Sequence, residues 1–252
     1  MSENIIATMN HQKYDRLFRL IFKEPKELLS LYNALSGKNY DDPNQLIINT
    51  LEDAVFIGIK NDVSFIINSY LNLYEHQTTI NPNMPLRGLF YFADLLKTEY
   101  KNAPIYGSVK IPLLTPQYVI FYNGIVDVPE RYEMRLSDLF IHKTTSPDLE
   151  VVAHVININL GHNKELADKC QMLREYMIFV DSVRGKLSDK PKELHRTLLA
   201  EVIDECIDKG ILSEILHKER YRIMESFLSH FDADEYVDYV KKESYESGYD
   251  SG

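Results

Sequence analysis

Two neighbouring stretches of the chain alternate in side-chain character with the two-residue period of a β-strand, one over residues 62–67 and the other over residues 71–77. Between them, Asn68-Ser69 is the only polar dipeptide that suits a tight turn. The pattern therefore predicts a β-hairpin that turns at these two residues.

Pairing about this turn brings two acidic side chains together. The antiparallel register sets Asp62 opposite Glu75, and Lys60 opposite Gln77, on one face of the hairpin. Directly paired side chains have Cβ atoms roughly 4.5–5.5 Å apart, and like charges there repel. A divalent metal ion between the carboxylates would relieve that repulsion. The alternative is a structural sheet with one polar face in water, and the register decides between them.

Apolar residues at helical spacing predict helices on both sides of the hairpin. The first runs over about residues 11–23, and the second ends at Gly37. The third begins at Asn83, a plausible N-cap, with Pro85 in its first turn. Its expected buried stripe is Leu86, Leu89, Phe90 and Ala93.

The order of elements predicts an α/β fold. Further strands are expected over residues 54–59, 118–122 and 151–160, and the chain reads as helical from about Lys192. Strands interrupted by one crossover helix favour a mixed sheet with helices on both faces. We expect an αβββαβ core within a domain of residues 1–185, a C-terminal helical extension over 186–242 and a flexible tail over 243–252.

Composition is that of a soluble globular protein, with 44% apolar and 26% charged residues among 252. We expect a cytoplasmic location, because no apolar run could span a bilayer, no secretory signal opens the chain, and Cys170 and Cys206 read as buried thiols. A net charge of −10 argues mildly against indiscriminate nucleic-acid binding. A local basic patch is compatible with it, and the N-terminal segment carries Lys13, Arg16, Arg19, Lys23 and Lys26.

Four short segments, in this order, resemble a known group of nucleases. They are Tyr14-Asp15-Arg16-Leu17-Phe18, Asn61-Asp62-Val63, Glu75-His76-Gln77 and Phe121-Tyr122-Asn123-Gly124. The set is similar to the PD-(D/E)XK nuclease superfamily and, within it, to the transposase-associated, recombination-promoting (Rpn-like) nucleases. The resemblance covers roughly residues 11–125 and implies a restriction-endonuclease-like fold.

The resemblance also implies a function, that of a metal-dependent DNA endonuclease. Asp62, Glu75 and the backbone carbonyl of His76 would bind a divalent cation, most simply magnesium, which prefers hard oxygen ligands. A bound cation polarises the phosphoryl oxygen and lowers the pKa of a bound water. DNA would be the substrate, and a homodimer would suit double-strand cleavage.

One motif position departs from the family pattern. Gln77 stands where lysine is common, and glutamine can hydrogen-bond a water but supplies no charge. Lys60 is the candidate replacement, because the predicted pairing places it beside Gln77; a surface lysine is the equal alternative. The departure keeps a second function open, a weak or inactive nuclease fold that serves as a nucleic-acid-binding or protein-interaction module.

Three further residues have both a functional and an ordinary interpretation. Asp15 could reach a second metal position from the first helix, although an aspartate near a helix start more often complements the macrodipole. Arg87 could contact a phosphate, although a solvent-facing arginine is commoner. The His76 side chain should point away from Glu75 and be packed or hydrogen-bonded, because neighbouring strand residues face opposite sides.

Overall fold

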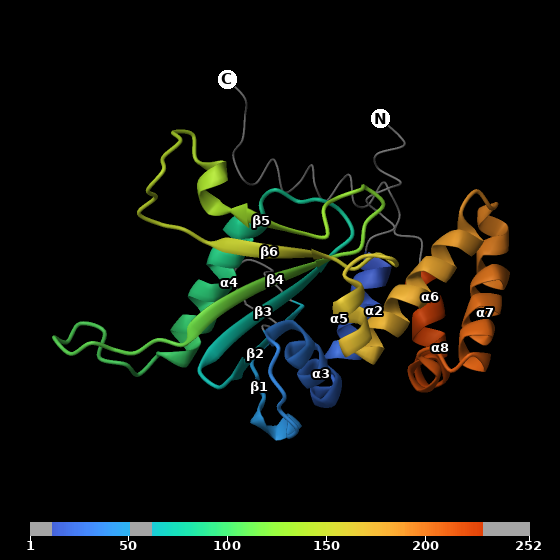
Figure 1. The fold of residues 1–252 in the computed structure, drawn as a ribbon, viewed down its shortest axis with the longest axis horizontal. Helices are drawn as coiled ribbons and strands as arrows, with labels where there is room; N and C mark the ends of the chain where they lie inside the picture. Colours follow the sequence, from blue (N-terminus) through green and yellow to red (C-terminus); the bar gives the residue numbers. More distant parts are fainter. Residues whose placement is uncertain (1–11, 51–61, 229–252) are drawn as a thin grey trace.

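A computed structural model describes residues 12–50 and 62–228, and within them one mixed sheet has the strand order β1-β2-β3-β4-β6-β5 (Figure 1). The strands are β1 (Ile47–Ile48), β2 (Val63–Ile67), β3 (Tyr70–Gln77), β4 (Thr115–Tyr122), β5 (Arg131–Arg135) and β6 (Val152–Asn157). Strands β3, β4 and β6 are parallel, whereas β1–β2, β2–β3 and β5–β6 pair antiparallel. The expected α/β class with a mixed sheet is confirmed.

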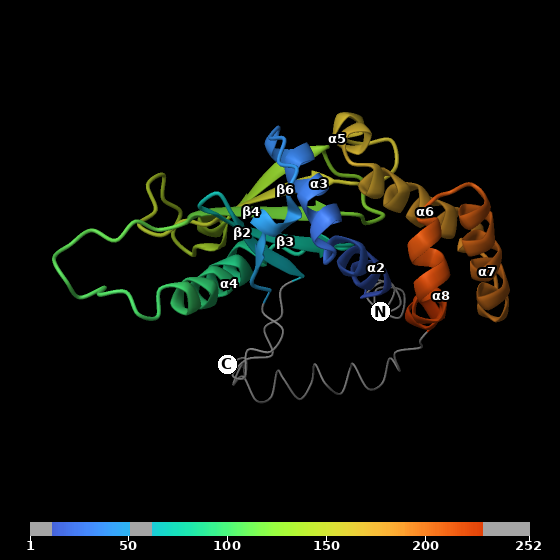
Figure 2. The ribbon, with the colours of Figure 1, turned by 90° about the horizontal axis from the view of Figure 1, so that it is seen from below.

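Helices lie on both faces of this sheet. They are α2 (Gln12–Phe22), α3 (Pro25–Ser36), α4 (Met84–Glu99), α5 (Lys164–Lys169), α6 (Gln171–Leu187), α7 (Lys192–Asp208) and α8 (Ser213–Leu228), with short 3-10 turns at Pro43–Gln45 and Leu136–Leu139. Figure 2 shows α4 on one face, α2 and α3 on the other, and α6, α7 and α8 gathered at one end. Helix α4 is the crossover that joins the parallel neighbours β3 and β4.

The two-residue period of the hairpin strands sorts their side chains between two hydrophobic cores. Phe65 and Tyr74 pack into the core formed with α2, α3, α6, α7 and α8. Ile66 and Leu73 belong to the core beneath α4. Since both faces of β2 and β3 are buried, a register slip of one residue would exchange these sets and is strongly disfavoured.

The expected buried stripe of α4 is wrong. Leu86 is 38% exposed and Phe90 48% exposed, and the face toward the sheet is instead Met84, Gly88, Tyr91, Phe92 and Leu95. Gly88 explains the rotation, because a Cβ there would lie 2.3 Å from the ring of Tyr118. The missing side chain lets the helix approach β4 closely, and this orientation brings Arg87 to Glu75 near the end of β3. Asn83 occupies the N-cap position but makes no side-chain cap hydrogen bond.

Other expectations differ in detail from the structure. Helix α3 ends as expected at Gly37, whose φ of 67° is left-handed. The helical pattern after Asn163 is broken at Cys170, where extended backbone separates α5 from α6. The sequence does not predict strand β5, because only Tyr132 and Met134 form its half-buried face, and the other three residues are charged and exposed. The strand expected over residues 54–59 lies outside the described residues.

The C-terminal helices share a core with the sheet domain. Helix α7 contributes Leu199, and helix α8 contributes Leu216 and Phe227, to the same cluster as α2 and α6. The Phe227 ring packs edge-on against Tyr14 of α2 at 5.3 Å between centroids. Helix α8 is thus anchored beside the N-terminal end of α2, and α7 packs against α6 and α8.

Replacing Gly88 by alanine should destabilise the protein, because the new methyl group meets the buried Tyr118 ring. Overpacking of this kind costs about 1–3 kcal/mol. The matched control is Gly185→Ala in α6, where no atom lies within 4 Å of the added Cβ; there, helix propensity should stabilise the fold by about 0.5–1 kcal/mol. Urea unfolding measures both. Equal effects would contradict the close approach of α4 to β4.

Candidate functional site

The hairpin places the two acids opposite each other. Asn68 and Ser69 form the turn with φ of 45° and 66°, the left-handed conformation that two-residue hairpin loops need. The pairing runs from Ile67↔Tyr70 to Val63↔Tyr74, so the next pair in this register joins Asp62 to Glu75. The turn and the register expected from the alternation are confirmed.

Each acid is hydrogen-bonded to the backbone of the other strand. The N–H of Asp62 donates to Oε1 of Glu75 at 3.1 Å, and the N–H of His76 donates to Oδ2 of Asp62 at 2.7 Å. These two hydrogen bonds hold the strands together beyond Val63 and Tyr74, the last residues that pair through the backbone alone. They also fix one oxygen of each carboxylate and leave Oδ1 of Asp62 and Oε2 of Glu75 directed elsewhere.

Those remaining oxygens each face an arginine. Nε of Arg19, on α2, lies 3.5 Å from Oδ1 of Asp62. Nη2 of Arg87, on α4, lies 3.2 Å from Oε2 of Glu75. The Arg87 fork also donates to the hydroxyl of Tyr91. Arg87 is therefore an ion-pair partner at the acid pair and not the solvent-facing residue that its type favours.

Burial perturbs both carboxyl groups. Burial, reinforced by the charge of Asp15, raises the pKa of Asp62 from 3.8 to about 6, although the His76 amide and Arg19 oppose the rise. Burial and the neighbouring Asp62 raise the pKa of Glu75 well above its usual range, against the opposing effect of Arg87. The Glu75 side chain is 2% exposed. Both carboxyl groups thus hold a proton more readily than a solvated acid does, chiefly because burial disfavours the charged form.

A second network supports the strand end from the opposite face. The His76 side chain is fully buried there, with Nδ1 2.5 Å from Oδ1 of Asp15 and Nε2 2.8 Å from the hydroxyl of Tyr176. Phe18 packs on the imidazole at 4.9 Å between ring centroids. His76 is hydrogen-bonded as expected, and the contact of Asp15 is with this ring.

Of Gln77 and Lys60, Gln77 alone lies within the described residues. Gln77 is the half-buried last residue of β3, and its carbonyl accepts a hydrogen bond from the Asn123 N–H at 2.8 Å. Lys60 lies outside the described residues, so its place beside Gln77 stays a prediction. The ligand role of the His76 carbonyl likewise stays a prediction.

The acid pair fits magnesium better than a softer metal. Within residues 12–50 and 62–228, no group of three or more histidine, cysteine, aspartate or glutamate side chains is arranged around a common metal position. Magnesium needs fewer protein ligands, because it keeps several waters and is held by one or two carboxylates together with substrate phosphates. Oδ1 of Asp62 and Oε2 of Glu75 are the carboxylate oxygens that would belong to such a set.

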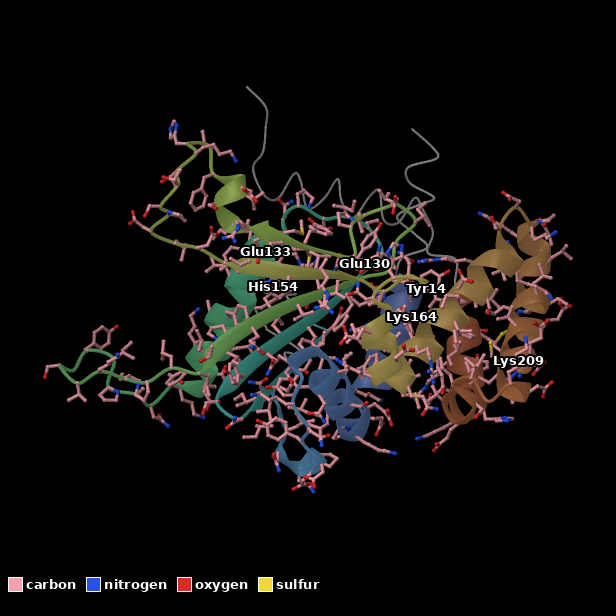
Figure 3. The ribbon with its side chains drawn as sticks, in the orientation of Figure 1. Tyr14, Glu130, Glu133, His154, Lys164 and Lys209 are labelled. Carbon is pink, nitrogen blue, oxygen red and sulfur yellow. The ribbon has the colours of Figure 1, made fainter. Side chains whose placement is uncertain are left out.

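A hollow lies away from the acid pair. It encloses about 800 Å³ over β4, β5 and β6, and its lining includes Glu133 and His154, which stand side by side on neighbouring strands (Figure 3). Nδ1 of His154 is 3.6 Å from Oε1 of Glu133, and both side chains are exposed. Neither Asp62 nor Glu75 lines the hollow. We place the candidate site at the acid pair, because two carboxylates are held together there with one oxygen of each fixed by a backbone amide.

Several contributors to the site were not identified from the sequence. Tyr91 and Tyr176 read as packing residues, and Arg19 as one charge among several on an amphipathic helix. The spacing of Arg87 and Tyr91, four residues apart on α4, is the signal that could have shown that they face the same way.

Comparison of the chain with protein-family models, curated proteins and solved structures finds no match. Among the described helices, none combines the length and the apolar character needed to cross a bilayer. The nuclease interpretation therefore depends on the residues of this chain alone.

The raised pKa of Asp62 should make stability pH-dependent in a defined direction. Between about pH 4 and pH 6 the folded protein holds a proton that the unfolded chain releases, so stability falls as pH rises through this window. Asp62→Asn lacks this titration. Its free energy of unfolding relative to wild type should therefore rise by on the order of 2–3 kcal/mol between pH 4 and pH 7.

Urea unfolding in EDTA across that range measures the difference, with Asp168→Asn, at an exposed position on α5, as the control. A difference between Asp62→Asn and wild type that stays constant with pH would contradict the raised pKa.

Proposed function

We propose that the protein is a magnesium-dependent endonuclease that hydrolyses phosphodiester bonds of DNA. The observation that carries the proposal is the carboxylate pair of Asp62, which is half-buried, and Glu75, which is buried. A backbone amide fixes one oxygen of each carboxylate, and the other oxygen faces an arginine. Such a pair costs free energy in a protein that uses it only structurally. A divalent cation would neutralise it and supply the Lewis acidity that phosphodiester hydrolysis needs.

The chain's own groups would prepare the site. The amides of Asp62 and His76 hold the carboxylates in place before any ligand arrives, which avoids reorganisation during the reaction. The bonds from His76 to Asp15 and Tyr176 fix the strand end that carries Glu75. Asp15 acts here as a positioning residue. Gln77 would hydrogen-bond the attacking water.

We place such an enzyme in the cytoplasm, in keeping with the resemblance to transposase-associated nucleases of DNA recombination. A homodimer is the assembly that would let it cut both strands. No described residue identifies the interface, and solution mass measurements with and without duplex DNA test this part separately.

A second candidate function is a nuclease-fold protein that binds nucleic acid or a protein partner without cleavage. The observation that favours it is the ion pair of Arg87 with Glu75, since a guanidinium already neutralises one of the two acids. The glutamine at position 77 favours it as well. Cleavage assays separate the two functions directly.

Purified protein should nick or linearise plasmid DNA in magnesium, and Asp62→Asn and Glu75→Gln should each lower the rate by about 100-fold or more, the scale of losing an electrostatic catalytic group. Glu133→Gln is the matched control, three strands away on β5, and should cleave like wild type. Magnesium should also raise the melting temperature of wild type and leave that of Asp62→Asn unchanged. Cleavage that survives both site substitutions would reject the proposal in favour of a contaminating nuclease.

A charge rescue tests the roles of Lys60 and Gln77. If Lys60 supplies the cation missing at Gln77, Lys60→Ala should lower the cleavage rate by about tenfold or more, and adding Gln77→Lys should restore it, because either lysine stabilises the same transition-state charge. Single-turnover rates measure the effect. Wild-type cleavage by Lys60→Ala would exclude this role for Lys60.

A further inference from the structure

Two arginines approach the acid pair from opposite faces of the sheet. Arg19 comes from α2 and Arg87 from α4, helices that cover different faces (Figure 2). The side chain of Arg19 is 41% exposed and that of Arg87 is 36% exposed, against 15% and 2% for Asp62 and Glu75. The arginine side chains are therefore more exposed than the acids that they pair with, and they face the solvent from which a ligand would arrive.

The two kinds of contact differ in how easily they can be exchanged. One oxygen of each carboxylate is held by a backbone amide, and releasing it would open the end of the hairpin. The other oxygen is held by an arginine on a long, flexible side chain. Oδ1 of Asp62 and Oε2 of Glu75 are thus the exchangeable atoms, and they are the same atoms that a cation would take.

Released arginines would remain at the site. Nε and Nη2 of Arg87 donate to the Tyr91 hydroxyl at 3.2 and 2.8 Å, which keeps the fork in place without Glu75. Burial raises the pKa of Tyr91 to about 12, so this hydroxyl stays neutral. Arg19 lies on α2, which also carries the exposed Arg16, and the exposed Lys23 directly follows this helix. Two guanidinium groups would then be free to bind anions, and phosphate is the anion that their planar fork matches.

We propose that Arg19 and Arg87 are phosphate-binding residues that occupy Asp62 and Glu75 in the ligand-free protein and exchange partners when the site is loaded. The acids pass from guanidinium to divalent cation, and the guanidinium groups pass from carboxylate to the phosphates of a nucleic-acid strand. This proposal rests on the proposed metal site and names the group that the site recognises, the phosphodiester backbone. Cation and nucleic acid should bind cooperatively, and linkage makes that coupling reciprocal.

The exchange predicts changes of opposite sign in Arg19→Gln and Arg87→Gln. Without nucleic acid, each variant should bind magnesium about three- to tenfold more tightly, because an internal competitor is lost. In calcium, each should bind a short labelled DNA duplex about tenfold more weakly, the effect of one charge-assisted hydrogen bond. The slope of log affinity against log salt should fall by about 0.9 for each lost phosphate contact.

Calorimetry with magnesium and fluorescence anisotropy with the duplex, in calcium and in EDTA, measure these quantities. Arg196→Gln is the matched control, an exposed arginine paired with Glu225 between α7 and α8, and should leave cation binding unchanged. Arg19→Gln keeps the test decisive if Arg87→Gln fails to fold, because it leaves the buried Glu75 paired.

The outcomes separate this exchange from the proposed function. Tighter cation binding with weaker duplex binding supports the exchange. Wild-type cation binding that Asp62→Asn abolishes, with neither arginine variant changing either affinity, overturns the exchange and leaves the metal site standing. If the arginine variants bind both the cation and the duplex more weakly, the exchange is also overturned, since that result shows that the arginines have a structural role. If the wild-type protein binds no cation, both the metal site and the exchange are rejected.

Discussion

The candidate site depends on two hydrogen bonds in which each acid of the hairpin binds the backbone of the other strand. The Asp62 amide holds Glu75, and the His76 amide holds Asp62, so the two carboxylates converge because the strands pair. This arrangement needs the left-handed turn at Asn68-Ser69 and the burial of both faces of the hairpin, which together exclude a slipped register. Whatever the protein does with this pair, the fold is built to maintain it.

The helices around the acid pair provide both charge and rigidity. Helix α4 approaches closely at Gly88 and so brings Arg87 to Glu75. On the other face, Asp15 of α2 and Tyr176 of α6 hold the buried imidazole of His76. The two arginines only partly offset the burial of the acids, because the pKa of each carboxyl remains raised. That residual cost is the physical reason to expect a cationic ligand, and it is typical of functional sites.

The local geometry of the site was predictable from the sequence where one period and one turn decided it. Alternation over β2 and β3 and the polar dipeptide between them were sufficient to place Asp62 opposite Glu75. The orientation of α4 was not, because its apolar residues occur around most of the helix and a single glycine contact with Tyr118 selects the buried face. The pairing of Asp15 with His76 depends on how α2 packs across the sheet, a tertiary contact that spacing along the chain does not encode.

The most direct test of the central claim is a crystal structure of the protein grown with manganese in place of magnesium, with the ion located by its anomalous scattering. Manganese shares the preference of magnesium for oxygen ligands. The account predicts one ion bonded to Oδ1 of Asp62 and Oε2 of Glu75, with both backbone hydrogen bonds retained and both arginines displaced. An acid pair that keeps Arg19 and Arg87 at saturating manganese, with no ion between the carboxylates, would contradict it.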